Sequence, residues 1–348
     1  MDKTLVEASR LLSASQSIVI STHVMPDGDG LGAEIALYHY LTRLGKKVRI
    51  LNPDPVPERY HFLDKGNVIE VVGPASANQK LGAFDLAVVV DTNDPKRLGA
   101  LWKIFETHAR DILFFDHHPN LEHSPEALSA ATKNLKVHTI LDVKSSSIGE
   151  LLYRLFHQAH DLLDPHSSSF RLTPEIALGL YVSIITDTNS FRYARTTALS
   201  HRIAADLIDY GLQPEEIYQN VYSTKSVNHL RLIGEVLSKV NEVENKTHGG
   251  TIAWVEITRD VRKKYGASSD DTQSIVNFLL LLKQAEVLIL FREEDDGRIK
   301  ASIKSKGTIR VNHIAQEFGG GGHEFAAGFT VSGKISQIRD KLLERLSK

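Results

Sequence analysis

Histidine and aspartate side chains follow several apolar runs in the first part of this 348-residue chain. Imidazole and carboxylate groups that converge can hold divalent metal ions, and two ions roughly 3.5–4 Å apart suit phosphoester hydrolysis. One ion generates hydroxide, and both neutralise the charge that develops on phosphorus. The candidate residues are, in chain order, His23, Asp27, Asp29, Asp91, Asp116, His117, His118 and Asp187.

The apolar runs predict the elements that position these residues. Short apolar runs bounded by polar residues are typical of buried parallel strands, and ligands bind beyond the carboxyl ends of such strands. An alternation of such strands with helices predicts an α/β fold with a doubly wound parallel sheet. We expect helices over 31–44 and 147–158, and strands over 17–22, 47–51, 86–91, 112–116 and 137–141.

The run 176–185 before Asp187 has two interpretations. Its mostly apolar character is that of one more buried strand ending in a metal-binding residue. Thr173 before Pro174, however, is typical of a helix N-terminus, and a helix fits the alternation of strands and helices better. We therefore expect a helix over 174–185, which still delivers Asp187 at its end.

Each part of the candidate centre also has an ordinary explanation. An isolated Asp-Gly-Asp-Gly is usually a turn, an aspartate after a strand often caps a helix, and adjacent histidines are usually solvated. The order of the parts and their position at strand ends favour a metal centre over these explanations. Mixed imidazole and carboxylate ligands favour Mn²⁺, with Co²⁺, Zn²⁺ and Mg²⁺ as alternatives.

Composition excludes several classes of function. The 41 basic and 43 acidic residues leave a net charge of −2, so no global basic field recruits long nucleic acid. Cysteine is absent, which excludes disulfides and thiolate metal ligands and fits a reducing cytosol. No run reaches the roughly 18 apolar residues of a membrane span, and residues 1–16 lack the apolar core of a signal peptide. A cytoplasmic protein is expected.

The pattern of expected elements changes near residue 225, from a mostly helical stretch to strands with helices between them. This change predicts two domains. The larger domain, over residues 1–225, would carry the metal centre and the start of a helical connector. A smaller α/β domain, over residues 226–348, would follow. In it we expect helices over 271–283 and 335–346, and strands over 251–255, 285–291, 300–303 and 328–331.

Four motifs of the first domain together resemble the DHH phosphoesterase superfamily. They are His23-x3-Asp27-Gly-Asp29, Asp91-Thr-Asn, Asp116-His117-His118 and Thr186-Asp187-Thr188. The glycine run that ends at His323, followed by Ala-Ala-Gly at 326–328, resembles the superfamily's DHHA1 substrate-binding domain. In length and layout the chain is most similar to the nano-RNases that also act as pAp phosphatases. The resemblance implies hydrolysis of oligoribonucleotides of about two to five nucleotides to mononucleotides. It also implies removal of the 3′-phosphate from 3′,5′-adenosine bisphosphate (pAp).

The resemblance implies a role for each residue of the candidate centre. Asp116 would orient the histidine pair, and His118 would face the substrate phosphate and assist the leaving oxygen. A hydroxide that bridges two ions would be the nucleophile, so no covalent enzyme intermediate is expected. One ion would be held by His23, Asp27 and Asp91, and the second by Asp29, Asp91, His117 and Asp187.

The glycine run in the second domain is expected to contact a phosphate. Backbone N–H groups of Gly320, Gly321 and Gly322 could crowd a phosphate, with His323 as a further donor. The ordinary explanation of four consecutive glycines is a flexible linker. The position of the run between apolar stretches inside one domain favours the phosphate role.

Three further residues match the superfamily's patterns at candidate substrate positions. Lys304 and Ser305 belong to a strand that usually carries arginine where Lys304 stands, and lysine supplies a point charge without the bidentate fork. Arg97 matches Asp91-x5-Arg97-x-Gly99 and could contact phosphate. Ordinary surface positions are the alternative for the lysine and the arginine. Asn189 stands where many relatives carry glycine, and asparagine tolerates the left-handed turn that glycine would adopt.

The leading hypothesis is a hydrolase whose partners are short RNA oligonucleotides and nucleotide phosphates. We expect it to bind neither a membrane nor long nucleic acid. A RecJ-like single-strand exonuclease would need a longer basic channel, and a family II pyrophosphatase lacks a second domain of this type. A cyclic or linear dinucleotide phosphodiesterase is another alternative, although many carry membrane or sensory segments. The non-enzymatic alternative is a nucleotide-binding regulator, but every expected metal ligand is present. A homodimer is compatible with the sequence.

Overall fold

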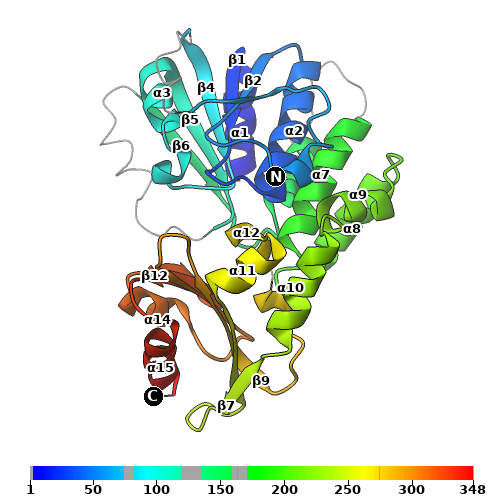
Figure 1. Ribbon diagram of the computed structural model, residues 1–348. Coiled ribbons are helices and arrows are strands. Elements are labelled where there is room, and N and C mark those ends of the chain that lie inside the picture. The colour runs from blue at the N-terminus through cyan, green and yellow to red at the C-terminus, as the bar shows by residue number, and fades with distance from the viewer. Residues whose placement is uncertain are drawn as a thin grey trace. The chain divides into compact units, whose positions relative to one another are not determined.

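The computed structural model describes residues 3–73, 82–118, 135–158, 163, 171–273 and 275–347. The chain forms two compact units, Met1–Thr224 and Lys225–Lys348 (Figure 1). Within the described ranges, every helix is too short or too polar to cross a membrane.

The first unit is built on a six-stranded sheet in which all neighbouring strands are parallel (Figure 1). The strand order is β3-β2-β1-β4-β5-β6, which is the order of the doubly wound sheet and confirms the predicted fold class. The sequence does not predict β3, because its three residues are exposed or half-buried and form no apolar run. The strands are β1 (Ser17–Ser21), β2 (Lys47–Asn52), β3 (Ile69–Val71), β4 (Phe84–Val90), β5 (Ala109–Asp116) and β6 (Lys136–Leu141).

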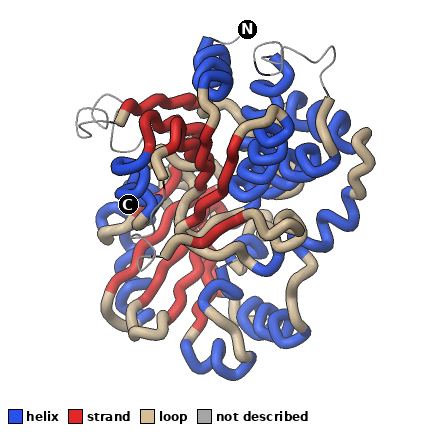
Figure 2. The backbone as a smooth tube through the Cα atoms, turned by 90° about the horizontal axis from the view of Figure 1, so that it is seen from above, coloured by secondary structure: helices blue, strands red, loops and turns tan. Residues whose placement is uncertain are grey.

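Helices cover both faces of this sheet, because each strand directs alternate side chains to opposite faces (Figure 2). Ala87 and Val89 of β4 pack with α3 (Leu101–His108) on one face. Val88 and Val90 share the core of the other face with α1 (Lys3–Ala14), α2 (Gly28–Arg43), α5 (Ile148–Gln158), α7 (Pro174–Asp187) and α8 (Ala198–Ile208). The unit also contains η1 (Glu58–Tyr60), η3 (Pro95–Leu98) and α9 (Pro214–Tyr222).

The apolar run before Asp187 forms α7, so the strand interpretation of this run is wrong and the helix interpretation is confirmed. The Ile176 N–H donates a hydrogen bond to Thr173 Oγ1 at 3.4 Å, and Pro174 lies in the first turn. Nine of the ten residues over 176–185 are buried. A helix buried on nearly all sides has a mostly apolar sequence, as a buried strand does, which explains the ambiguity.

Two glycines bring the backbones of α2 and α7 into direct contact. A Cβ atom on Gly179 of α7 would lie 2.5 Å from the Gly32 carbonyl oxygen of α2, and one on Gly32 would lie 2.4 Å from the Gly179 oxygen. The two helices therefore pack closer than residues with side chains would allow. Because α2 carries Asp29 in its first turn and α7 ends at Asp187, this contact sets the spacing between two candidate ligands.

The second unit is built on a six-stranded mixed sheet in the order β11-β12-β10-β9-β8-β7. Only β8 and β9 pair in parallel among its described neighbours. Leu288 and Leu290 of β9 join one core, whereas Ile289 and Phe291 join the core on the opposite face. The strands are β7 (Asn241–Glu244), β8 (Thr251–Ile257), β9 (Ala285–Glu293), β10 (Ile299–Ser305), β11 (Gly321–His323) and β12 (Ala326–Val331).

The helices of the second unit differ from the prediction: the sequence does not predict the short helices Arg259–Tyr265 and Asn312–Glu317, and one expected helix is divided. The single helix expected over 271–283 is wrong, because the chain forms two shorter helices there. The Ser269 carbonyl oxygen accepts hydrogen bonds from the Thr272 hydroxyl and from Arg292 of β9, so these contacts attach the first of the two helices to the sheet. The helices are α10 (Val227–Leu237), α11 (Arg259–Tyr265), α12 (Ser269–Gln273), α13 (Val276–Leu279), α14 (Asn312–Glu317) and α15 (Ile335–Leu346).

Candidate metal centre

Three parallel strands of the first unit end beside one another and deliver candidate ligands to one edge of the sheet (Figure 1). β4 ends directly before Asp91, β5 ends at Asp116 directly before His117, and β1 ends two residues before His23. The strand order reverses between β1 and β4, which is where an open α/β sheet forms a ligand crevice at its carboxyl edge. His23 Nε2 lies 3.2 Å from Asp91 Oδ2 across this point.

The start of α2 adds Asp27 and Asp29 to the same edge. Asp27 is the N-cap of α2, and its carboxylate accepts the N–H of Asp29 at 3.0 Å and that of Gly30 at 3.4 Å. The Asp29 carboxylate accepts the N–H of Ile148, the first residue of α5, at 3.0 Å, and also the Ser183 hydroxyl. Helix N-termini therefore hold both carboxylates in place, because their exposed N–H groups favour negative charge.

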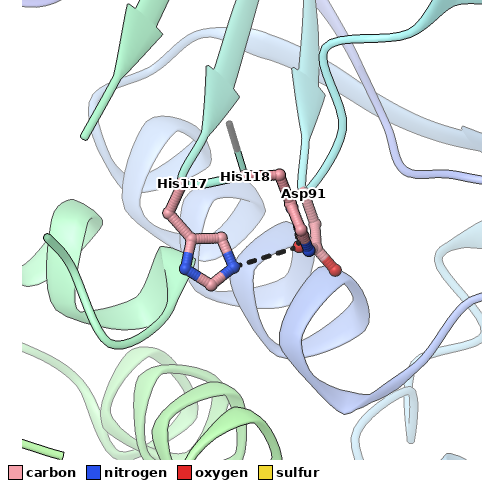
Figure 3. Close-up of side chains that lie close together, drawn as sticks. All are labelled: Asp91, His117 and His118. Atoms are coloured by element: carbon pink, nitrogen blue, oxygen red, sulfur yellow. Dashed lines mark ion pairs between the residues drawn. The ribbon is translucent and has the colours of Figure 1, made fainter. Parts of the chain in front are cut away.

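His117 lies in the middle of the assembled side chains. Its Nε2 atom is 3.3 Å from Asp29 Oδ2, 3.5 Å from Asp187 Oδ2 and 3.6 Å from Asp91 Oδ1. Figure 3 shows His117 and His118, from the end of β5, beside Asp91 from the end of β4. Three overlapping groups place their ligand atoms within 4.8 Å of one another: His23, Asp27 and Asp91; Asp29, His117 and Asp187; and Asp91, His117 and His118.

Two buried atoms at the centre of these groups have no hydrogen-bond partner among the described residues. They are Asp91 Oδ1 and His117 Nε2. The other ring nitrogen of His117 lies 3.2 Å from the Ser145 carbonyl oxygen, so a proton on Nδ1 leaves the Nε2 lone pair directed at the three carboxylates. Buried polar atoms without partners are costly, and a divalent ion would satisfy both. The residues present therefore fit a metal ion.

Asp91 itself has a strained backbone. Its φ angle of 65° lies in the left-handed region, which costs a non-glycine residue roughly 1–3 kcal/mol. The Asp91 N–H donates to the Phe115 carbonyl oxygen of β5 at 3.0 Å, and this bond holds the turn against the neighbouring strand. The turn brings the carboxylate to both His23 and His117. Strain of this kind is concentrated at functional sites, where the surrounding structure maintains it.

Asp116 organises the chain that follows β5. Its Oδ1 atom accepts the N–H groups of His117 and His118 at 2.8 and 3.1 Å and lies 2.8 Å from His118 Nδ1. Its Oδ2 atom accepts the Asn93 side-chain amide at 2.5 Å. Asp116 therefore orients the ring of His118, whereas the ring of His117 is oriented by the Ser145 carbonyl. The resemblance had assigned both rings to Asp116.

Burial and mutual repulsion change the pKa values of the centre. Burial raises the pKa of Asp27 to about 6 and that of Asp29 to about 7, and the negative charge of Asp91 adds to both shifts. Burial lowers the pKa of His117, but the nearby carboxylates of Asp29, Asp91 and Asp187 outweigh burial and raise the pKa to about 12. The carboxylates of this cluster repel one another, so in the absence of another cation the cluster binds protons.

We expect Mn²⁺ binding to strengthen as the pH rises, because an ion must displace the protons on Asp27, Asp29 and His117. The pKa values of both acids are raised, so their protons stabilise the metal-free fold fully below about pH 4 and this stabilisation is lost by about pH 7. The Tm of the metal-free protein should therefore fall from pH 5 to 7.5, while the increase in Tm that Mn²⁺ produces should grow. Titration calorimetry in two buffers of different ionisation enthalpy would count the released protons. A dissociation constant that is independent of pH would contradict the expectation.

Arg97 lies close to His23. Its carbonyl oxygen accepts the Val24 N–H at 2.7 Å. Burial lowers the pKa of His23, and the charge of Arg97 acts in the same direction, but the hydrogen bond and charge of Asp91 outweigh both and raise it. The structure therefore places this arginine beside the metal centre.

The candidate substrate residues of the second unit gather at one corner of its sheet. β12 lies between β10, which ends with Lys304 and Ser305, and β11, which ends with His323. Lys304, Ala326 and His323 occupy one row across the three strands. Burial lowers the pKa of Lys304. The Ser305 hydroxyl contacts Glu286 at 3.3 Å.

The second half of the glycine run, Gly321 and Gly322, belongs to β11, so the run is not a flexible linker. A Cβ atom on Gly320 would lie 2.1 Å from the Gly328 oxygen, and one on Gly322 would lie 2.6 Å from the Ala326 oxygen. The close approach of β12 therefore requires glycine at these two positions, whether or not a phosphate binds there. At Gly321 no atom lies within 4 Å of the added Cβ, so packing gives no reason for that glycine.

Sequence reasoning misses two side chains that contact the candidate ligands. Ser183 donates to Asp29 from α7, and Arg195 donates to Asp187 from the turn after α7. Ser183 lies inside the apolar run 176–185, where a polar residue is a signal of its own. The only signal for Arg195 is a basic residue a few positions after the last candidate ligand.

Comparisons with known proteins agree with this architecture. The model of the "DHH family, N-terminal domain" matches residues 17–184, and that of the "DHHA1 domain" matches residues 233–348. The chain is 29% identical to the bifunctional oligoribonuclease and PAP phosphatase NrnA of Thermus thermophilus, over 99% of this chain and 93% of that protein. It is 26% identical to the protein of the same name from Bacillus subtilis, over 93% and 92% of the two chains.

A solved structure shares the whole architecture. The exopolyphosphatase-related protein from Bacteroides fragilis has a TM-score of 0.84 and 26% sequence identity, and the match covers 100% of this chain and 96% of that one. Together with the matched domains, this likeness spans both units. The chain therefore belongs to the DHH family of metal-dependent phosphoesterases, with a DHH domain followed by a DHHA1 domain.

Proposed function

We propose that this protein hydrolyses very short oligoribonucleotides to mononucleotides and removes the 3′-phosphate from pAp. The observation that carries this proposal is the pair of unpartnered ligand atoms, Asp91 Oδ1 and His117 Nε2, buried among carboxylates at the strand ends. The near-full-length likeness to proteins named as bifunctional oligoribonucleases and PAP phosphatases supports the choice of substrates.

Two divalent ions, with Mn²⁺ as the preferred species, are proposed as cofactors. Bound ions would lower the pKa of a water molecule and neutralise charge on the reacting phosphate. Asp91 has one oxygen toward His23 and the other toward His117, so it is suited to serve both ligand sets. The proposed sets are His23, Asp27 and Asp91 for one ion, and Asp29, Asp91, His117 and Asp187 for the other.

His118 is proposed as the group that gives a proton to the leaving oxygen. Burial lowers its pKa, but the hydrogen bond to Asp116 and the charge of Asp91 outweigh burial and raise it. A histidine that keeps its proton near neutral pH can act as a general acid. Its side chain is 23% exposed, whereas that of His117 is 1% exposed, so His118 is the more accessible of the pair.

Arg97 and the corner of the second sheet are proposed as phosphate contacts. Arg97 brings a positive charge next to His23, where the phosphate would meet the ions. In the second unit, by itself, Lys304, Ser305, the backbone of Gly320–Gly322 and His323 are proposed to contact phosphate or sugar groups. We also predict that the protein is cytoplasmic and that it forms a homodimer.

The test is a Mn²⁺ time course on 5′-labelled RNA of two, five and twenty-four nucleotides, with pAp in parallel. We expect the two-mer to disappear fastest and pAp to release phosphate. Faster hydrolysis of the twenty-four-mer would support a RecJ-like exonuclease. If no substrate is hydrolysed, the alternative of a nucleotide-binding regulator is supported. Repeating the series with Co²⁺, Mg²⁺ and Zn²⁺ would test the choice of ion.

A further inference from the structure

Arg195 is a cation that contacts both the metal centre and solvent. Its Nη1 atom donates to Asp187 Oδ2 and lies 3.5 Å from His117 Nδ1. Its side chain is 36% exposed, against 3% for Asp91. Arg195 therefore lies at the rim of the centre, where it can contact a candidate ligand and an incoming molecule.

The Asp187 oxygen that Arg195 contacts is the same oxygen that faces the candidate ion position. Asp187 Oδ2 lies 3.5 Å from His117 Nε2, and the two side chains form one ligand group with Asp29. An ion in that group would meet the guanidinium at a shared ligand atom. Two cations at one oxygen repel each other, so ion binding weakens the contact between Arg195 and Asp187.

The turn between α7 and α8, which carries this guanidinium, is held in an unusual conformation. Asn189, Ser190 and Phe191 have φ angles of 47°, 55° and 64°, and Asn189 adopts the left-handed backbone expected from the sequence. The Ser190 N–H donates to the Ile185 oxygen at 2.7 Å, and the Phe191 N–H donates to Thr188 Oγ1 at 3.1 Å. Consecutive left-handed residues persist only where the surroundings impose them, and such strain is frequent at ligand clamps.

We propose that Arg195 is an exchangeable counter-ion of the metal centre. It neutralises Asp187 while the ion position at Asp29, His117 and Asp187 is empty. Once an ion binds Asp187, the guanidinium turns to a substrate phosphate, whose oxygens it can hold in a bidentate manner. The phosphate contact rests on the proposed function, whereas the competition with the metal ion does not.

Arg195→Gln separates the two parts of this inference, because glutamine retains a hydrogen-bond donor but removes the charge. In calorimetric titration of the metal-free protein, we expect the dissociation constant of the Mn²⁺ ion at Asp29, His117 and Asp187 to fall about three- to tenfold. At saturating Mn²⁺, we expect the KM for pAp to rise about tenfold, with a smaller change in kcat. Tighter metal binding combined with weaker substrate binding distinguishes a counter-ion from a residue that only supports the fold.

Two further variants serve as controls. Arg202→Gln removes the same charge from an exposed position on α8 and should change neither quantity. Arg195→Lys restores the charge without the planar fork, so it should return Mn²⁺ affinity to the wild-type value and recover part of the KM.

Weaker Mn²⁺ binding in Arg195→Gln would overturn the inference, because Arg195 would then support the ligands and not compete with the ion. Tighter Mn²⁺ binding with an unchanged KM for pAp would overturn the proposed contact between Arg195 and a substrate phosphate. If the wild-type protein hydrolyses neither pAp nor short RNA, the proposed function fails, and the calorimetric comparison still decides the competition.

Discussion

Asp91→Asn is expected to abolish Mn²⁺-dependent hydrolysis and to leave the fold intact. Asparagine tolerates the left-handed backbone at this position and keeps the N–H that donates to Phe115. It removes the one negative charge that faces both His23 and His117. Loss of several kcal/mol of transition-state stabilisation corresponds to a decrease in kcat of about a thousandfold or more.

Activity on the two-nucleotide RNA and on pAp, together with Mn²⁺ titration calorimetry, would measure this effect. Glu106→Gln is the matched control, because it removes an acid from α3, which precedes the opposite end of β5. The metal-free Tm of Asp91→Asn should fall below that of the wild type, because the imidazoles of His23, His117 and His118 outweigh burial and hold the pKa of Asp91 well below its usual range, so that its charge stabilises the metal-free protein. Undiminished turnover in a variant that no longer binds Mn²⁺ would disprove the metal-centre interpretation.

Gly179→Ala is expected to lower the free energy of unfolding by about 2–3 kcal/mol. Helix propensity alone predicts the opposite sign, a gain of about 1 kcal/mol when alanine replaces glycine inside a helix. The added Cβ would lie 2.5 Å from the Gly32 oxygen and 2.9 Å from the Ala36 nitrogen, so α2 and α7 must separate. Because the two helices carry Asp29 and Asp187, Mn²⁺ affinity should decrease as well.

Gly234→Ala provides the control for this prediction. Gly234 lies in α10, is exposed, and no atom outside its own helix lies within 4 Å of an added Cβ. This variant should be stabilised by several tenths of a kcal/mol to about 1 kcal/mol. Urea denaturation of the three proteins would compare the values. Stabilisation by both substitutions would show that the contact between α2 and α7 is looser than described.

Much of the first unit is predictable because its central strands are buried on both faces and therefore carry apolar runs. β1, β4 and β5 each have such a run, and the side chains that follow them meet because parallel strands end at one edge. β3 and β7 have exposed residues and no such pattern, so the sequence does not predict them.

Other parts of the site depend on distant contacts that no local pattern encodes. The ring of His117 is oriented by the Ser145 carbonyl, a backbone group from a segment 28 residues away. Arg195 reaches Asp187 because of a left-handed turn, and of the three residues of that turn only Asn189 has a type that suggests it. In the second unit, the short helix α12 is bound to the sheet by the side chain of Arg292, which lies on another element, β9.

The spacing of the candidate ligands along the chain has a consequence for biosynthesis. The ligands extend from residue 23 to residue 187, and α7, which carries the last of them, must pack against α2 before the set is complete. A chain still under translation therefore cannot complete the candidate ligand set until α7 has left the ribosome and docked. Because a ligand stabilises only the state that binds it, metal ions would protect completed copies of the first unit and give truncated or misassembled copies no such protection from proteolysis.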